Sequence, residues 1–179
     1  MRDRLLIHSC CAPCSSAIIE ELYKYFDITL YFYNPCITDA EEYYLRANEL
    51  KKFCKEMGNK VKLVIADYDP SIYYEVISGF ENQPEGGTRC SICFKQRLIG
   101  TAKYASEHNF KYFSTTLTIS PYKDSAVVNA IGKSCGWSCG VMYMPFDFGY
   151  LYTYSLMLCE KYELYQQNYC GCEYSKNSL

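Results

Sequence analysis

The sequence lacks the long apolar run that a membrane span needs. No stretch approaches the roughly 20 apolar residues of a transmembrane helix, and residues 1–14 are too briefly apolar for a signal peptide. Strong charge of one sign is also missing, because 18 Lys and Arg stand against 20 Asp and Glu, for a net charge of −2. We therefore expect a cytoplasmic protein with no membrane partner. A nucleic acid would have to meet a local basic patch rather than a global positive field.

Internal repeats, low-complexity segments and linkers are absent as well, which limits the possible architectures. The 179 residues are 49% hydrophobic and 21% charged, a globular composition that excludes disorder, collagen and coiled coil. This length suits one domain with a substantial core. We expect residues 1–179 to form a single α/β domain.

Segments of strand and helix character alternate along the chain. The predicted strands are residues 4–9, 28–33, 61–66, 111–117 and 140–144. The predicted helices begin at residue 15 and then span 38–57, 91–108, 124–133 and 150–163, with a turn predicted at Gly136 and Gly140. Such alternation predicts a mostly parallel sheet covered by helices on both faces. In these folds ligands bind at the carboxyl ends of the strands, especially at the first strand-to-helix turn.

Cysteine and tyrosine are abundant instead, with 12 and 20 copies. A reducing compartment disfavours a disulfide framework, so metal binding or redox chemistry is the better expectation for the thiols. Seven of them fall into three motifs, which are Cys10-Cys11-Ala12-Pro13-Cys14, Cys90-Ser91-Ile92-Cys93 and Cys170-Gly171-Cys172. The other five are expected to be mostly small core side chains; they are Cys36, Cys54, Cys135, Cys139 and Cys159.

The first two motifs have the character of metal ligands. Cys10, Cys11 and Cys14 precede a predicted helix, whose positive end favours thiolates. The Cys90 and Cys93 spacing fits a metal clip, although redox pairs also use it. With Cys10 and Cys11 they provide four thiolates for a structural zinc or an iron–sulfur cluster. Spacing does not choose between these metals, but adjacent cysteines favour a cluster, in which each thiolate binds its own iron.

The third motif lies near the C-terminus and is typical of a redox pair. Cys170 and Cys172 can reach the upper end of disulfide separations, and Gly171 eases the bend. So small a ring would be strained and easily reduced. The alternative is a pair of unrelated tail thiols.

Together these motifs resemble the QueH family of epoxyqueuosine reductases. The matching segments run in order along the chain; they are LLIHSCCAPCSS (5–16), YFYNP (31–35), EYYLR (42–46), DYDP (67–70), PEGGTRCSICFKQRL (84–98), TTLTISPYKD (115–124) and NYCGCEYS (168–175). Two positions depart from the family pattern. Cys36 stands where asparagine is usual, and Gln166 stands where we expect arginine.

The resemblance implies a Rossmann-like three-layer sandwich similar to adenine-nucleotide alpha hydrolases. It also implies cobalamin-independent reduction of epoxyqueuosine to queuosine in the anticodon loop of tRNA, with an electron donor as a further partner. The residue roles that it implies are a [4Fe–4S] cluster on Cys10, Cys11, Cys90 and Cys93, a redox-active pair of Cys170 and Cys172, and Cys14 as a ligand of an additional mononuclear iron.

Two alternatives stay open. An ATP-dependent tRNA-modifying enzyme of this fold would carry a glycine-rich phosphate loop after the first strand. The turn here holds Cys10, Cys11 and Pro13 and no glycine, which argues against it. A zinc- or iron–sulfur-binding sensor module without catalysis would explain the thiols but not the terminal pair.

Basic and aromatic side chains near the motifs are candidates for contact with RNA. Arg89, Lys95, Arg97 and Lys123 could meet phosphates, although a solvated helix face explains Lys95 and Arg97 equally well. An unstacked base could lie on an aromatic ring. The candidate rings are Tyr122, Tyr169 and Tyr174.

Overall fold

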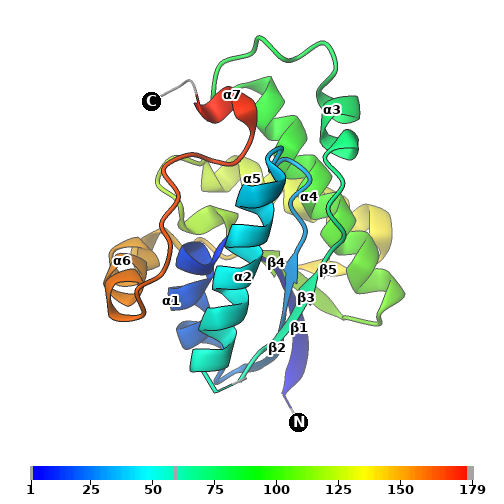
Figure 1. Cartoon of the computed structure of the whole chain (residues 1–179). Coiled ribbons are helices and arrows are strands. Elements are labelled where there is room, and N and C mark those ends of the chain that lie inside the picture. The colour runs from blue at the N-terminus through cyan, green and yellow to red at the C-terminus, as the bar shows by residue number, and fades with distance from the viewer. Residues whose placement is uncertain (1, 59, 177–179) are drawn as a thin grey trace.

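A five-stranded parallel sheet forms the centre of the computed structural model, which describes residues 2–58 and 60–176 (Figure 1). The strands are β1 (Asp3–His8), β2 (Phe26–Phe32), β3 (Lys62–Ile65), β4 (Tyr112–Thr115) and β5 (Met142–Tyr143). Their order is β3-β2-β1-β4-β5, and every neighbouring pair is parallel. The central strand β1 pairs Ile7 with Leu30 of β2 and with Ser114 of β4.

Helices return the chain between successive strands, as parallel pairing requires. They are α1 (Ala12–Leu22), α2 (Ala40–Glu56), α3 (Ser71–Ile77), α4 (Thr88–Glu107), α5 (Ser125–Cys139), α6 (Tyr152–Lys161) and α7 (Glu173–Lys176), with short 3₁₀ turns at η1 (Leu117–Ile119) and η2 (Gly149–Leu151). Two helices begin where an aspartate caps free backbone N–H groups. Asp39 accepts from Glu41 and Glu42 at α2, and Asp124 accepts from the first turn of α5.

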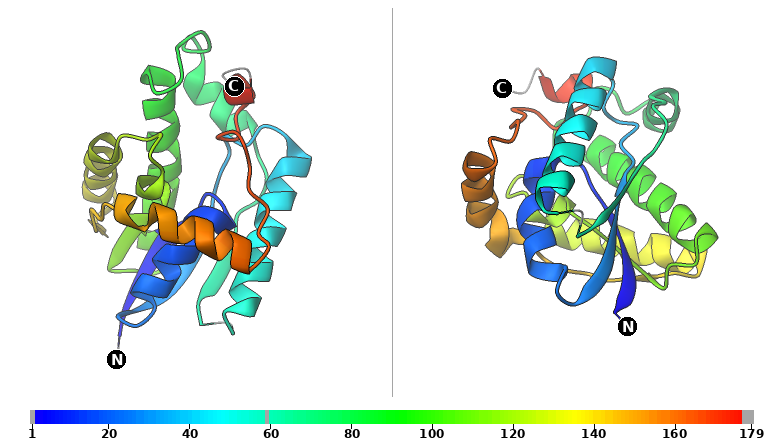
Figure 2. Two further views of the ribbon diagram at one scale, coloured as in Figure 1. Left: turned by 90° about the vertical axis from the view of Figure 1, so that its left-hand side faces the viewer. Right: turned by 60° about the horizontal axis from the view of Figure 1, so that its bottom comes forward.

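Successive side chains of the buried strands point to opposite faces of the sheet and build two cores. Leu5 and Ile7 pack with α1, α2 and α6, whereas Leu6 packs with α4 and α5. Figure 2 shows α6 lying beside α1 on one side of the sheet and α4 with α5 on the other. The arrangement confirms the predicted Rossmann-like three-layer α/β sandwich.

The predicted turn at Gly136 is wrong, because α5 continues through it to Cys139. Gly136 is needed for close packing, since a Cβ there would lie 2.6 Å from the carbonyl oxygen of Val141. Gly140 ends the helix instead, in the left-handed conformation with φ of 67°. Within the described ranges, none of the helices combines the length and the apolar character that crossing a bilayer takes.

Candidate metal and redox centre

The turn between β1 and α1 is held rigidly by side chains from two segments. The Cys11 sulfur caps α1 by accepting from the Cys14 backbone N–H at 3.4 Å. The Ser15 hydroxyl donates to the Cys11 carbonyl at 2.7 Å, and the Asn34 amide donates to the Ser9 carbonyl at 2.8 Å. These bonds satisfy the backbone of a buried turn that contains no glycine.

Three sulfurs converge at this turn. The Sγ atoms of Cys10, Cys11 and Cys14 all lie within 4.8 Å of one another, and those of Cys10 and Cys11 are 3.6 Å apart. The Thr116 hydroxyl, just past the end of β4, lies 3.4 Å from the Cys10 sulfur. From the C-terminal segment, the Gln167 amide donates to the Cys11 sulfur at 3.0 Å. The three thiols could hold a metal ion.

Negative charge at the turn concentrates on one thiol. Hydrogen bonds from Cys11 and then Cys14 hold the pKa of Cys10 well below its usual value. Burial, followed by the bond to Cys10, raises the pKa of Cys11 to about 12. The thiolate that the sequence predicts beside this helix is therefore centred on Cys10.

A second group of thiols lines a cavity of about 20 Å³ beside the start of α4. Cys90 and Cys93 share one face of α4 because they are one turn apart. The Gly86 N–H donates to the Cys90 sulfur at 3.2 Å, which anchors the loop before the helix. The five cysteines around the cavity are Cys36, Cys90, Cys93, Cys170 and Cys172.

Cys36 is a member of this centre that sequence reasoning missed. It is buried, as expected for a core side chain, but it lines the cavity next to Cys93. A hydrogen bond from the Cys93 thiol, opposed by burial and aided by Arg97, lowers the pKa of Cys36 to about 6. The position of Cys36 directly after the YNP motif, at the carboxyl end of a predicted strand, was the available signal.

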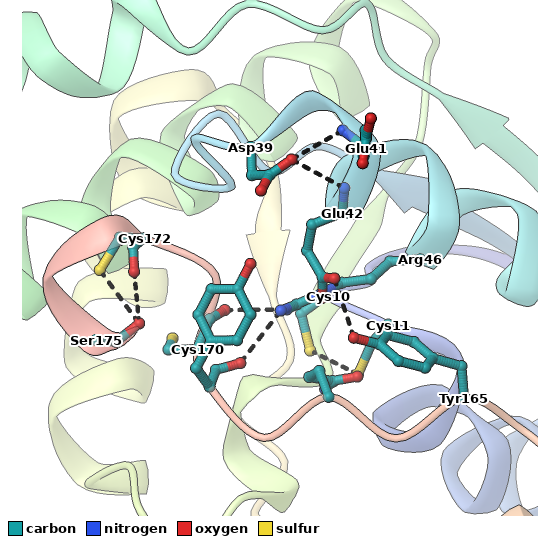
Figure 3. A network of polar contacts seen from close by, with 12 residues as sticks. Cys10, Cys11, Asp39, Glu41, Glu42, Arg46, Tyr165, Cys170, Cys172 and Ser175 are labelled. Atoms are coloured by element: carbon teal, nitrogen blue, oxygen red, sulfur yellow. Dashed lines mark hydrogen bonds and ion pairs between the residues drawn. The ribbon is translucent and has the colours of Figure 1, made fainter. Parts of the chain in front are cut away.

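Arg46 of α2 holds the C-terminal cysteine segment in place (Figure 3). Its Nη1 donates to the Cys170 carbonyl at 3.1 Å and its Nη2 donates to the Tyr169 carbonyl at 3.2 Å. The Glu42 carboxylate accepts from Arg46 Nε at 2.6 Å and from the Tyr165 hydroxyl at 3.0 Å. The buried ion pair with Glu42 thus orients the planar guanidinium of Arg46 so that it donates to two carbonyls of the tail.

The glycine between the two tail cysteines is required by its backbone and its surroundings. Gly171 has φ of 128°, and a Cβ there would lie 2.9 Å from Ile37 Cγ1 and 3.4 Å from Arg46 Nη1. Cys170 and Cys172 both line the cavity, and the Cys172 thiol donates to the Ser175 hydroxyl at 3.5 Å. All twelve thiols lie in the described part of the chain, and all are free.

The structure changes the interpretation of the basic side chains. Arg89 and Arg97 are buried, so they do not meet phosphates at the surface. Arg89 Nη1 instead donates to the carbonyls of Glu81 and Gln83. Lys95 is exposed, and Lys123 is half-buried beside the thiol centre.

The predicted site residues therefore lie in two groups, and the charge of Cys10 in the first acts on Cys36 in the second. Cys14 lies with Cys10 and Cys11, whereas Cys90 and Cys93 lie with the tail pair. The division of these thiols among metal ions and a redox pair stays a prediction.

A family model described as epoxyqueuosine reductase QueH matches residues 5–178. The chain belongs to the QueH family. A protein of Streptococcus pyogenes serotype M1 named epoxyqueuosine reductase QueH is 42% identical, with 98% of this chain and 71% of the relative covered. Proteins of the same name from Staphylococcus epidermidis and Thermotoga maritima are 38% and 31% identical, covering 97% and 96% of this chain and 76% and 89% of those proteins.

Proposed function

We propose that this protein reduces epoxyqueuosine to queuosine in the anticodon loop of tRNA. The observation that carries the proposal is the convergence of thiols from four separate segments at the carboxyl end of the sheet. Ligand sites of such sheets lie at this edge. The name that the curated relatives share supports the same reaction.

The donor set fits a thiolate-bound metal cofactor. We assign Cys10, Cys11, Cys90 and Cys93 as ligands of a [4Fe–4S] cluster and Cys14 as a ligand of an additional mononuclear iron. Cysteine thiolates are the usual ligands of such clusters, and the three sulfurs at the first turn already lie within 4.8 Å of one another. When bound, the cluster would supply electrons one at a time and the second iron would supply a Lewis acid for the epoxide oxygen.

The tail cysteines match the stoichiometry of the reaction. Converting an epoxide to an alkene consumes two electrons and two protons and releases the oxygen as water. Oxidation of the Cys170 and Cys172 thiols to a disulfide releases two electrons and two protons. An external electron donor must then reduce the disulfide, and cobalamin has no part in this balance.

The tail pair is well placed for this role. Both cysteines line the cavity that Cys90 and Cys93 share. Arg46 fixes the carbonyls of Tyr169 and Cys170, so the pair is held at the site rather than left on a free tail.

The tRNA would have to approach this same edge of the sheet for its modified base to reach the thiols. Tyr122 is 85% exposed and directly precedes Lys123, whose charge interacts with Cys10, Cys14 and Cys170. We assign Tyr122 as a stacking platform for an unstacked base and Lys123 as a cation close to the reacting position.

The direct test is conversion of tRNA that carries epoxyqueuosine. The anaerobically reconstituted protein with a chemical reductant should yield queuosine, detected by mass spectrometry of the digested nucleosides. Conversion should need neither ATP nor cobalamin. A protein that binds metal but leaves the nucleoside unchanged would be the non-catalytic module, and dependence on ATP would favour the other alternative.

A further inference from the structure

Arg97 carries a buried charge without a partner among the carboxylates of the described chain. Its side chain is 1% exposed, and its Nε and Nη2 atoms have no hydrogen-bond acceptor among the residues that the structure describes. Arg46, which is also buried, differs because Glu42 and two carbonyls bind its guanidinium. An unpaired buried cation is costly, so we expect a negative charge close to it.

The position of Arg97 on α4 shows where that charge lies. Cys90, Cys93 and Arg97 are spaced i, i+3 and i+7, which places them on one face of the helix. All three line the thiol cavity. Although burial lowers the pKa of Arg97, the charges of Cys36, Cys93 and other thiols raise it well above its usual value.

The thiols whose charges act on Arg97 follow strands β1 and β2, lie on α4 or belong to the tail. Arg97 is therefore under the influence of both thiol groups. Its charge acts on Cys93 and Cys170 at the cavity and on Cys10 at the first turn. Burial keeps an RNA phosphate away from it. The anions within its reach therefore lie inside the protein: the Cys36 thiolate faces it, and its Nε and Nη2 donors, which have no acceptor among the described residues, are available to an anion bound at the thiols.

We propose that Arg97 is the counter-charge of the cluster site, donating hydrogen bonds to the sulfurs that hold the cluster. This inference rests on the proposed function, which places a [4Fe–4S] cluster at these thiols. A cluster on four thiolates is negatively charged, and reduction by one electron adds a further negative charge. A fixed cation beside it favours the reduced form and raises its reduction potential. Arg97 is thus a positioning residue that acts through the cluster.

The test compares the reconstituted wild-type protein with Arg97→Met, Arg97→Lys and Lys103→Met. Lys103 is an exposed cation of the same helix, so its variant is matched in charge. Arg97→Met should move the cluster to a more negative midpoint potential and make its loss to a chelator about tenfold faster. Arg97→Lys should restore most of the potential, and Lys103→Met should match the wild type. A wild-type potential in Arg97→Met would overturn the proposal.

Thermal unfolding of the metal-free proteins separates this role from a structural one. Metal-free Arg97→Met should lose little stability, because Cys36, the thiol whose pKa Arg97 helps to lower, can take up a proton when the cation is removed. A clear loss of stability in the metal-free variant, with an unchanged potential in the loaded one, would make Arg97 structural. If Arg97→Met does not fold, that failure counts against the proposal and Arg97→Lys still reports the potential. A wild-type protein without iron and sulfide would instead contradict the proposed function.

Discussion

Cys54 in the core and Cys36 at the cavity are both buried thiols, yet their environments differ in kind. Burial among apolar side chains raises the pKa of Cys54 to about 11, and burial does the same for Cys135 and Cys159. Cys36 is as buried but receives a hydrogen bond from Cys93 and faces Arg97, so its pKa falls to about 6. Burial alone keeps a thiol protonated, whereas a second thiol and a cation beside it favour the thiolate form.

Replacing one cysteine of the tail pair and, separately, one core cysteine should give the largest difference in turnover. Cys172→Ala removes half of the tail pair and should stop multiple turnover while leaving the cluster in place. Cys159→Ala should turn over like the wild type and lose about 1 kcal/mol of stability. Repeated conversion of epoxyqueuosine tRNA by each variant is the measurement. Full activity of Cys172→Ala would eliminate the dithiol from the reaction.

Alkaline pH should destabilise the protein through its core thiols. Their folded pKa of about 11 lies above the ordinary value of 9.0. The stabilisation is therefore complete below pH 9 and is lost as pH rises toward 11, by up to about 3 kcal/mol for each thiol. Urea unfolding of the metal-free protein between pH 8 and pH 10.5 should show this decline, with a shallower slope in Cys159→Ala. An equal slope in both proteins would mean that Cys159 ionises freely in the fold.

The two hydrogen bonds that Arg46 donates to carbonyls of the tail should affect turnover more than its charge does, because they hold the tail in place. Arg46→Lys keeps a cation beside Glu42 but cannot bind both carbonyls, so turnover should fall about tenfold. Hydrogen exchange of residues 165–176 should rise in parallel. Lys52→Met is the control, because Lys52 of the same helix also contacts the tail, at the Glu163 carbonyl, but is exposed. If Arg46→Lys leaves both exchange and turnover unchanged, Arg46 does not position the pair.

The smallest effect is expected at Cys36. The resemblance to QueH implies asparagine at this position, and the side-chain carbonyl of an asparagine can accept a hydrogen bond from the Cys93 thiol as the Cys36 sulfur does. Cys36→Asn should therefore retain the cluster and change turnover by less than about fivefold. Iron analysis and the tRNA assay would show this. Loss of the cluster in Cys36→Asn would make Cys36 a ligand.

The fold was predictable because its strands are short apolar runs bounded by turns. The strand predicted at residues 28–33 corresponds to β2, and the helix predicted at 38–57 corresponds to α2. Gly136 misled the prediction, since a glycine that permits close packing has the same sequence signature as a glycine in a turn. Only the packing of Val141 against the helix distinguishes them.

The site was predictable in its motifs but not in its connections. The three cysteine motifs lie where the carboxyl ends of parallel strands bring segments together. Arg46, however, binds a carbonyl 124 residues away, and such a contact has no local signal. The spacing of Arg97 from Cys90 and Cys93 puts the three residues on one face of the helix, but its complete burial has no local signal in the sequence.

Metal and sulfide content distinguishes a cluster-bearing reductase from a zinc-binding protein. Iron, acid-labile sulfide and zinc would be measured in anaerobically purified wild type, Cys10→Ser and Cys159→Ala. We expect about four irons and four sulfides per chain, with further iron, in the wild type and in Cys159→Ala, and their loss in Cys10→Ser. A single zinc without sulfide in the wild type, or an intact cluster in Cys10→Ser, would contradict it.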